Sequence, residues 1–414
     1  MHTDYIALSI PIFFLLIGIE LFFDRQQRRD LYRFNDSLTN ISLGIGQQVT
    51  GVFVKTAVML GYIFLYDHVR VYTIPTTLLN WLLLFIGVDF FYYWFHRASH
   101  EVNFLWAAHI VHHQSEDYNL SVALRQSWLQ GLFSWVFYLP LAIVGFDPIM
   151  FLTISSFNTL YQFWIHTQTI KSLGPLEWFL NTPAHHRVHH GSNLKYIDRN
   201  HGGTLIIWDR LFGTFQKEEE EVVYGITKPL KSWNPVWANV HYWSELSEMA
   251  LKTNSWTDRL RIFLKPPGWQ PKEQGGFAHP AEPDKKNYKK YDASVSVHMM
   301  WYVLFQFVFA LVLAVMLLFK GGSANIWQLI VTVAYIIFTL VICGGIMDKK
   351  IWNYQAELVR ISVGLLLPVA FIMAESFEGF FLWALLYVSI SGIWFHELTR
   401  KKNINITTSP IRHE

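Results

Sequence analysis

The sequence predicts an all-α, polytopic membrane protein of about nine transmembrane helices, with a histidine-rich helical cap on its cytoplasmic face. Three observations predict this class. Hydrophobic residues make up 52% of the 414 positions and charged residues only 15%, below the quarter or so of a typical soluble domain. Long apolar runs recur along the chain. Of the 18 histidines, ten fall between positions 96 and 190.

Nine apolar runs are the expected membrane spans. A helix needs about 20 mainly apolar residues to cross the hydrocarbon core of a bilayer. The runs are residues 5–23, 41–66, 74–95, 128–146, 148–165, 299–319, 326–347, 358–374 and 380–394. Their lengths favour membrane helices over buried helices of a large soluble core.

Basic residues in the short loops set the expected orientation. The loop after the first run, "DRQQRRDLYR", contains four arginines and is therefore expected in the cytoplasm. Alternation from there places residues 166–298 inside, together with "MDKK" and the tail "TRKKN". All the clustered histidines then lie on the cytoplasmic side of an integral membrane protein.

The pattern predicts two domains. Residues 1–298 hold five spans and a polar cap, which ends in the Pro/Gly/Lys-rich stretch "KPPGWQPKEQGGFAHPAEPDKKNYKK". Residues 299–414 hold four spans. The net charge of +2, without a long basic stretch, argues against nucleic-acid binding. The single cysteine, Cys343, excludes an intramolecular disulfide, so any metal must be held by nitrogen and oxygen. Oligomeric state is left open.

The histidines form three boxes at helical spacing. The first is His96 and His100, the second His109, His112 and His113, and the third His186, His189 and His190. Residues three and four apart lie on one side of a helix, so each box presents its imidazoles together. Eight ligands exceed the four of one tetrahedral ion, which predicts two metal ions in a shared pocket. Imidazole suits iron, zinc, copper or nickel, so the ligands do not choose the metal.

Asp89 lies inside the third expected span, where an acid is costly and points to function. At 100° per residue, Asp89, Tyr93, His96 and His100 fall within a wedge of about 60°. Metal-bound imidazoles commonly donate their second N–H to a carboxylate, so we expect Asp89 to orient a ligand. Solvation of the helix end is the alternative.

The boxes resemble a known family. "HRASH", "HIVHH" and "HHRVHH" are similar to the three histidine boxes of the fatty acid hydroxylase/sterol desaturase superfamily of membrane di-iron oxygenases. The stretches "NTPAHHRVHHGSN" and "YIDRNHGGTLIIWDRLFGTF" resemble its ether-lipid-cleaving members, and the likeness covers nearly the whole chain. The resemblance implies two iron ions on the three boxes. Glu101, directly after the first box, matches an acid of that subfamily's motif, which implies a catalytic role.

The rest of the metal sphere is left open by the resemblance. Related lipid hydroxylases take two further ligands from a membrane H-x-x-x-H motif. Here His166 matches its first member, but Ile170 stands at the second. His166, His185 or Glu101 therefore remains to complete the sphere.

The resemblance implies an oxidoreductase that uses O₂ to hydroxylate the O-alkyl carbon of an ether lipid, releasing a fatty aldehyde and a glycerol derivative. It implies tetrahydrobiopterin as reductant. No dinucleotide or haem motif is present, so electrons come from a diffusible pterin or another external donor. Within "SEDYNLSVALRQS", we expect contacts to the lipid headgroup or pterin, or ordinary loop structure, from Asp117, Tyr118, Asn119 and Arg125.

Two other functions compete with this one. A sterol or fatty-acyl desaturase or hydroxylase of the same superfamily uses identical ligands, so only the lipid pocket differs. A metal transporter would instead place its ligands along a path through mid-membrane. The boxes here lie at the cytoplasmic ends of spans or beyond them, which disfavours transport.

Overall fold

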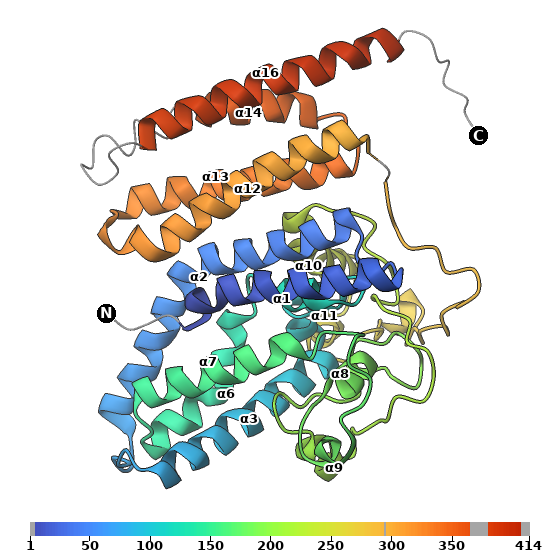
Figure 1. The fold of residues 1–414 in the computed structure, drawn as a ribbon. Helices are drawn as coiled ribbons and strands as arrows, with labels where there is room; N and C mark the ends of the chain where they lie inside the picture. The colour runs from blue at the N-terminus through green and yellow to red at the C-terminus, as the bar shows by residue number, and fades with distance from the viewer. Residues whose placement is uncertain (1–4, 294, 365–379, 407–414) are drawn as a thin grey trace. The chain divides into compact units, whose positions relative to one another are not determined.

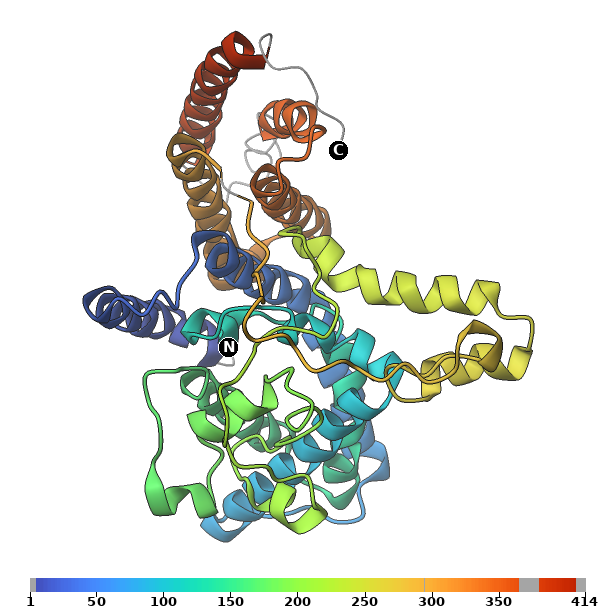
Figure 2. The same cartoon turned by 90° about the vertical axis from the view of Figure 1, so that its right-hand side faces the viewer.

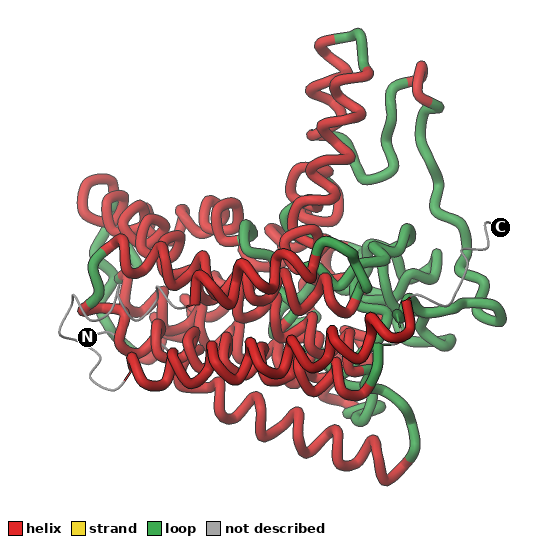
Figure 3. The backbone as a smooth tube through the Cα atoms, turned by 90° about the horizontal axis from the view of Figure 1, so that it is seen from above, coloured by secondary structure: helices red, strands yellow, loops and turns green. Residues whose placement is uncertain are grey.

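A computed structural model describes residues 5–293, 295–364 and 380–406 of the chain. These residues form helices joined by loops, with no β-strand among them (Figure 3). The chain divides into two compact units. The first comprises Met1–Lys231 and Val236–Tyr291, and the second comprises Ser232–Pro235 and Asp292–Glu414. The predicted all-α class is therefore confirmed.

Long helices and short helical segments alternate in the first unit. The long helices are α1 (Tyr5–Gln27), α2 (Phe34–Val69), α3 (Leu78–Glu101), α6 (Gly131–Val144), α7 (Pro148–Trp164) and α10 (Pro235–Lys252). The short segments are α4 (Asn103–Ala107), α5 (Ile110–His113), η1 (Leu120–Leu124), η2 (Gly174–Trp178), α8 (Pro183–His189), α9 (Ile207–Phe212), α11 (Trp256–Leu264) and η3 (Lys272–Gln274). Helices α2, α3, α6 and α7 run alongside one another, and α8 and α9 lie toward one end of them (Figure 1).

An apolar core holds α2, α3, α6 and α7 together. Its buried members are Tyr62, Leu84, Val88, Leu141, Ala142, Phe146, Met150 and Phe151. The turn between α6 and α7 requires a glycine, because Gly145 has a φ of 111° and an added Cβ would lie 1.6 Å from the carbonyl oxygen of Tyr72. Asp147 then caps α7 by accepting the N–H of Ile149 at 2.8 Å, and Pro148 takes the first helical position.

The region between α7 and α10 is a compact cap of loops and short helices. It appears as the green segments around α8 and α9 in Figure 2. Two isolated bridges tie it together, one between Leu180 and Leu205 and one between Gly191 and Tyr224. Within the same unit, α10 and α11 form a separate arm that includes the apolar cluster around Leu246 and Ile262.

Four helices make up the described part of the second unit. They are α12 (Val297–Lys320), α13 (Ile326–Met347), α14 (Asn353–Gly364) and α16 (Phe380–Ile406), with the short η4 (Gly321–Ser323) between the first two. Helix α13 begins with a capping box between Asn325 and Gln328. The expected span 358–374 lies partly outside the described residues.

Among the residues that the structure describes, four helices are long and apolar enough to cross a membrane: Phe34–Val69, Leu78–Glu101, Val297–Phe319 and Ile326–Met347. The chain is thus an integral membrane protein, and nine spans are more than these helices show. Of the other expected spans, 128–146 contains helix α6, whose 14 residues reach about 21 Å against a hydrocarbon core of roughly 30 Å. Helix α7 has 17 residues.

Candidate metal centre

Five imidazoles from three parts of the chain form the five-histidine group. It consists of His96, His100, His109, His113 and His189, all of them buried. Helix α3 supplies the first two, because residues four apart share one helix side. One nitrogen of each residue lies within 4.8 Å of those of all the others. The structure thus joins members of all three boxes.

Four imidazoles form the adjoining four-histidine group, made of His112, His166, His186 and His190. The two groups are in contact with each other, because the rings of His113 and His190 stack with centroids 4.4 Å apart. His166 lies two residues after the end of α7 and brings its Nε2 within 3.2 Å of that of His112. Of the three residues left open by the sequence, His166 is the one that joins a group.

The spacing of the nitrogens fits metal ligation. The Nε2 atom of His109 is 3.1 Å from that of His96 and 3.2 Å from that of His113. The Nε2 atom of His186 is 3.0 Å from that of His166 and 3.2 Å from that of His190. Ligands about 2.1 Å from one ion are roughly 3.0 to 3.4 Å apart in octahedral or tetrahedral geometry. In addition, the buried Nε2 atoms of His100 and His189 have no hydrogen-bond partner in the described chain.

The outer nitrogens of six imidazoles point to oxygen acceptors. In four of them the Nδ1–H donates to a backbone carbonyl: His96 to His201, His112 to Arg125, His166 to Gln162, and His189 to Arg199. In the other two it donates to a side chain: His109 to the Oε1 of Gln130, and His100 to the Oδ1 of Asp198. An imidazole that donates through Nδ1 keeps its lone pair on Nε2. The ring tautomers therefore direct unprotonated nitrogens into both groups.

Burial also favours the neutral imidazoles that metals need. It lowers the pKa of His109 and of His166 from the usual 6.5 to about 4. The pKa values of His112, His113, His186, His189 and His190 are lowered well below 6.5, first by burial and then by neighbouring imidazoles. At neutral pH the groups are uncharged nitrogen donors, which suit iron and other transition metals.

Asp89 has no imidazole among its hydrogen-bond partners. It instead anchors the loop around residues 201–205, whose His201 carbonyl accepts a hydrogen bond from His96. Its carboxylate accepts hydrogen bonds from the backbone N–H groups of Thr204 and Leu205 at 2.7 and 3.1 Å. The indole of Trp208 and the amide of Asn158 donate to it at 2.9 Å each. The loop comes this close because Gly203 has no side chain; an added Cβ would lie 3.0 Å from the Asp89 carboxylate. The expected orienting role thus acts indirectly, since this loop presents the His201 carbonyl to His96.

Asp209 holds the same loop from the other side. Its carboxylate accepts the N–H groups of His201 and Gly202 at 2.7 Å each, and the hydroxyl of Thr214 at 2.7 Å. Burial raises the pKa of Asp209 to about 6. The boxes did not indicate this residue, although it belongs to the quoted stretch "YIDRNHGGTLIIWDRLFGTF".

His201 is a further imidazole at the centre, and the spacing argument missed it. It is fully buried, and neither ring nitrogen has a hydrogen-bond partner in the described chain. Its ring centroid is 5.0 Å from that of His100 and 5.6 Å from that of His96. It lies outside the two groups as defined by mutual nitrogen distance. His201 lies eleven positions after the last box and has no histidine three or four residues away. Its place at the centre therefore follows only from the path of the loop in the folded structure.

Two predicted residues lie outside both groups. His185 is buried beside the ring of Phe215, with centroids 5.4 Å apart, and belongs to neither group. Glu101 ends α3, where its carboxylate is 47% exposed and pairs with the Nε of Arg97 at 2.8 Å. Glu101 directly follows His100 in the chain. Burial, together with the charge of Glu101, raises the pKa of Asp198 to about 6, and the Oδ1 of Asp198 lies 3.3 Å from the Nδ1 of His100.

The four residues of the loop after the second box are engaged internally. Asp117 pairs with Arg33 and Lys290 at 2.8 and 2.6 Å. Asn119 caps η1 by accepting the N–H of Ser121. Contacts of these residues with a cofactor or headgroup stay a prediction.

Tyr118 and Arg125 reach the centre more directly. The ring of Tyr118 lies 5.3 Å from that of His190, and its hydroxyl donates to the carbonyl of Ile165. The guanidinium of Arg125 donates to the carbonyl of Val111, while its own carbonyl accepts the Nδ1–H of His112. Arg125 therefore contacts the second box through hydrogen bonds at Val111 and His112.

Comparison with known proteins agrees with this geometry. A family model described as fatty acid hydroxylase matches residues 81–214, which include every member of both groups. The alkylglycerol monooxygenase of Xenopus tropicalis is 39% identical over 359 residues, covering 86% of this chain and 80% of that protein. The human enzyme of that name is 40% identical, covering 84% and 78%, and that of Danio rerio is 36% identical, covering 94% and 89%.

The chain belongs to the alkylglycerol monooxygenase family. Similarity to three such proteins over most of both lengths decides this. No solved structure shows significant similarity to the chain. Family membership makes the protein an O₂-dependent monooxygenase, and its two histidine groups fit the di-metal site of the fatty acid hydroxylases.

A pH series should show when the metal leaves. Protons compete with metal for the Nε2 lone pairs, so affinity falls as pH falls. Because burial lowers the pKa of His109 and His166 to about 4, metal content should persist at pH 5 and drop near pH 4. The stability of the fold should begin to decrease below about pH 6.5 and continue to decrease down to about pH 4, because in this interval the unfolded chain binds protons that the folded imidazoles do not. Dialysis and elemental analysis test this; complete release at pH 6 would contradict a buried centre.

Proposed function

We propose that this chain hydroxylates the O-alkyl carbon of ether lipids of the alkylglycerol type, with two iron ions as its metal. The hydroxylated product is a hemiacetal, which breaks into a fatty aldehyde and a glycerol derivative. The observation that carries the proposal is the pair of adjoining histidine groups in a chain whose relatives are alkylglycerol monooxygenases. The five-histidine and four-histidine groups would hold the two iron ions, and iron bound there would supply O₂ activation.

The protein's own contribution is to hold and shield the centre. Carbonyls of Arg125, Arg199 and His201, from two loops, fix three of the imidazole rings, and burial keeps the rings of the centre neutral. The candidate spans α2 and α3 belong to the same unit as the histidine groups, and we expect the alkyl chain of the substrate to enter from the bilayer. A buried site also excludes water from reactive oxygen chemistry.

The substrate is best tested with three lipid classes. Membranes containing the protein, supplied with O₂ and tetrahydrobiopterin, should convert 1-O-alkylglycerol to fatty aldehyde and leave a sterol and a free fatty acid unchanged. Turnover of the sterol or acyl chain alone would favour the alternative, a desaturase or hydroxylase of the same superfamily. Replacing the pterin by NADPH and a reductase tests the proposed reductant separately.

The proposed topology has nine spans, with the five-span residues 1–298 as the di-iron domain and residues 299–414 as a four-span membrane domain. Tags after Arg29, within 217–235 and at Glu414 should then report the cytoplasm, and a tag within 321–325 the outside. Protease protection of sealed vesicles measures this. An external report from the 217–235 tag would place the histidine centre on the other face.

Glu101 is proposed to handle protons at the edge of the centre, beside Asp198. Its carboxylate lies outside both histidine groups, so Glu101→Gln should retain two metal ions while turnover falls at least about tenfold. Elemental analysis and an alkylglycerol assay on one preparation separate the two properties. Arg97→Gln, which removes the ion-pair partner but no carboxylate, is the matched control. Wild-type turnover in Glu101→Gln would make the acid an ordinary helix-end residue.

A further inference from the structure

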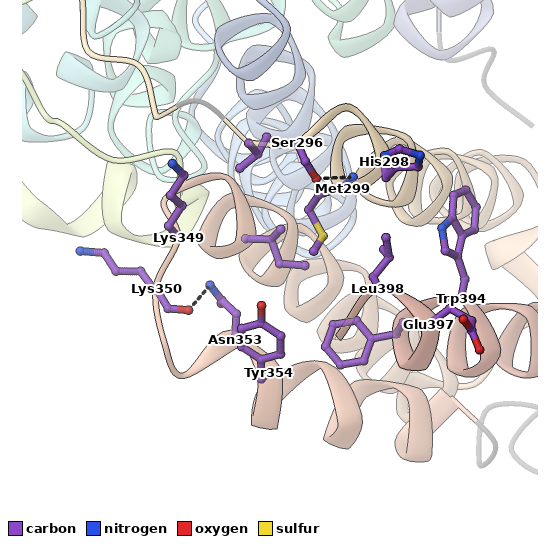
Figure 4. A pocket seen from close by; sticks show the side chains of 13 residues that line it. Ser296, His298, Met299, Lys349, Lys350, Asn353, Tyr354, Trp394, Glu397 and Leu398 are labelled. Carbon is purple, nitrogen blue, oxygen red and sulfur yellow. Dashed lines mark hydrogen bonds between the residues drawn. The ribbon is translucent and has the colours of Figure 1, made fainter. Parts of the chain in front are cut away.

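One cavity lies entirely within the second unit, at the end where α12 begins, α13 ends and α14 begins (Figure 4). Its volume is about 530 Å³. Sites for small molecules commonly measure about 300 to 1,000 Å³. The cavity is therefore large enough for a lipid headgroup with the first part of its chains.

The lining is chemically divided. Two cationic residues, Lys349 and Lys350, follow one another along one side, and Trp394 and Glu397 stand on the opposite side (Figure 4). Apolar and aromatic side chains, among them Met299 and Phe395, form much of the wall between. A purely anionic ligand would meet the carboxylate of Glu397, and a purely cationic ligand would meet the two lysines.

A buried polar atom in the lining has no partner. Asn353 is only 3% exposed, and its Nδ2 donates to the carbonyl of Lys350 at 2.9 Å. Its Oδ1 accepts no hydrogen bond from the described chain. A buried acceptor without a donor costs free energy, so the chain itself leaves the polar groups at this end of the cavity incompletely satisfied.

A buried polar network fixes the helices around the cavity. About two turns beyond Asn353 and Met299, the guanidinium of Arg360 donates to Glu357 at 2.6 and 2.7 Å and to Gln306 at 2.8 Å. Tyr302 also donates to Glu357. Arg360 and Glu357 are both fully buried. The network joins α12 to α14, so the two helices that line the cavity are held in place before any ligand arrives.

The depth of the cavity matches a membrane boundary. Its lining residues Ser296, His298 and Ile346 lie next to Val297 and Met347, which end the candidate spans Val297–Phe319 and Ile326–Met347. Lipid headgroups occupy that level, where lysines and tryptophans are typical protein partners.

We propose that this cavity binds a zwitterionic phospholipid headgroup. The phosphate lies toward Lys349 and Lys350, and the ammonium lies toward the carboxylate of Glu397 and the indole of Trp394, which attracts cations through its ring face. The acyl chains pack along Met299 and Phe395. This lipid site belongs to the second unit, goes beyond the proposed reaction and uses none of the histidine ligands.

Binding of water-soluble lipids to the full-length protein in nonionic detergent tests the proposal. Equilibrium dialysis with radiolabelled dihexanoyl phosphatidylcholine and dihexanoyl phosphatidic acid measures affinity, with inorganic phosphate as competitor. The variants are Glu397→Gln and the double variant Lys349→Gln/Lys350→Gln. The control is Lys286→Gln/Lys289→Gln, which removes two exposed positive charges from the first unit. Metal content and thermal melting verify that each variant is folded.

The proposal expects a distinct pattern. Glu397→Gln should weaken phosphatidylcholine binding about fivefold and leave phosphatidic acid binding equal or tighter, because only the zwitterion has an ammonium. The double lysine variant should weaken both lipids by about fivefold or more, as phosphate contacts at a membrane surface do. The control should bind like the wild type. Equal phosphatidylcholine binding by all variants overturns the proposal, as does displacement of the lipid by millimolar inorganic phosphate, which would identify a free-phosphate site.

Discussion

Purified protein should contain about two metal ions per chain, and His190→Ala should reduce this to about one and abolish turnover. The four-histidine group keeps only three nitrogens after this change, so its ion loses one of its four imidazole ligands and should be held much more weakly. In His113→Ala the five-histidine group still has four nitrogens, so the metal should be held more weakly but retained. Turnover in both variants should fall by more than about 10- to 100-fold, which is the loss typically seen when a residue that hydrogen-bonds to a metal ligand is mutated. Elemental analysis and the alkylglycerol assay measure the two effects.

His279→Ala is the control for these variants, because this histidine is exposed and belongs to neither group. It should keep two ions and full turnover. Metal content that stays at two in both ligand variants would contradict the assignment of the two groups. Zinc in overexpressed protein agrees with it, since imidazole ligands accept zinc as well as iron.

Asp89→Asn should give the second large effect, although no imidazole contacts this carboxylate. Four donors converge on it, so an amide nitrogen placed there meets at least one donor and leaves buried groups unpaired. Each such group costs about 1 to 3 kcal/mol. The loop 200–208 should loosen, and metal affinity and turnover should fall about 10- to 100-fold through lost orientation of His96.

Thermal melting, metal titration and the alkylglycerol assay together measure this prediction. Asp67→Asn is matched in chemistry, but its side chain is 54% exposed, so none of the three readouts should change. A variant Asp89→Asn with wild-type melting and metal affinity would show that the loop does not depend on its anchor.

The ligands within each box were predictable because helix periodicity is local. His96 and His100 share a side of α3, and the spacing alone states this. The number of histidines in the three boxes also predicted two metal ions in a shared pocket, and the structure distributes these histidines over two adjoining groups. His166 was an open possibility, and its place depends on where α7 ends.

The remaining features depend on contacts distant in sequence. Whether Asp89 touches an imidazole or a loop is decided by residues 158 and 204–208, more than 65 positions away. His201 and Asp209 have no periodic partner, and the path of the loop alone brings them to the centre. Helix bounds differed as well: α2 begins at Phe34, where the polar residues Asn35, Asp36 and Asn40 are buried, while hydropathy alone placed the span at 41–66. Asp36 accepts hydrogen bonds from Asn40 and Ser115, which compensate for that burial.

Labelled oxygen tests the central claim most directly. The protein is incubated with 1-O-alkylglycerol, reduced pterin and ¹⁸O₂, and the aldehyde is reduced at once to its alcohol to prevent exchange with water. Hydroxylation of the O-alkyl carbon puts the new oxygen on that carbon, and cleavage of the hemiacetal leaves the original ether oxygen on glycerol. Mass spectrometry should therefore find one ¹⁸O in the fatty alcohol and none in glycerol. Label in glycerol, or aldehyde formed without any label, would contradict a monooxygenase that acts at the ether carbon.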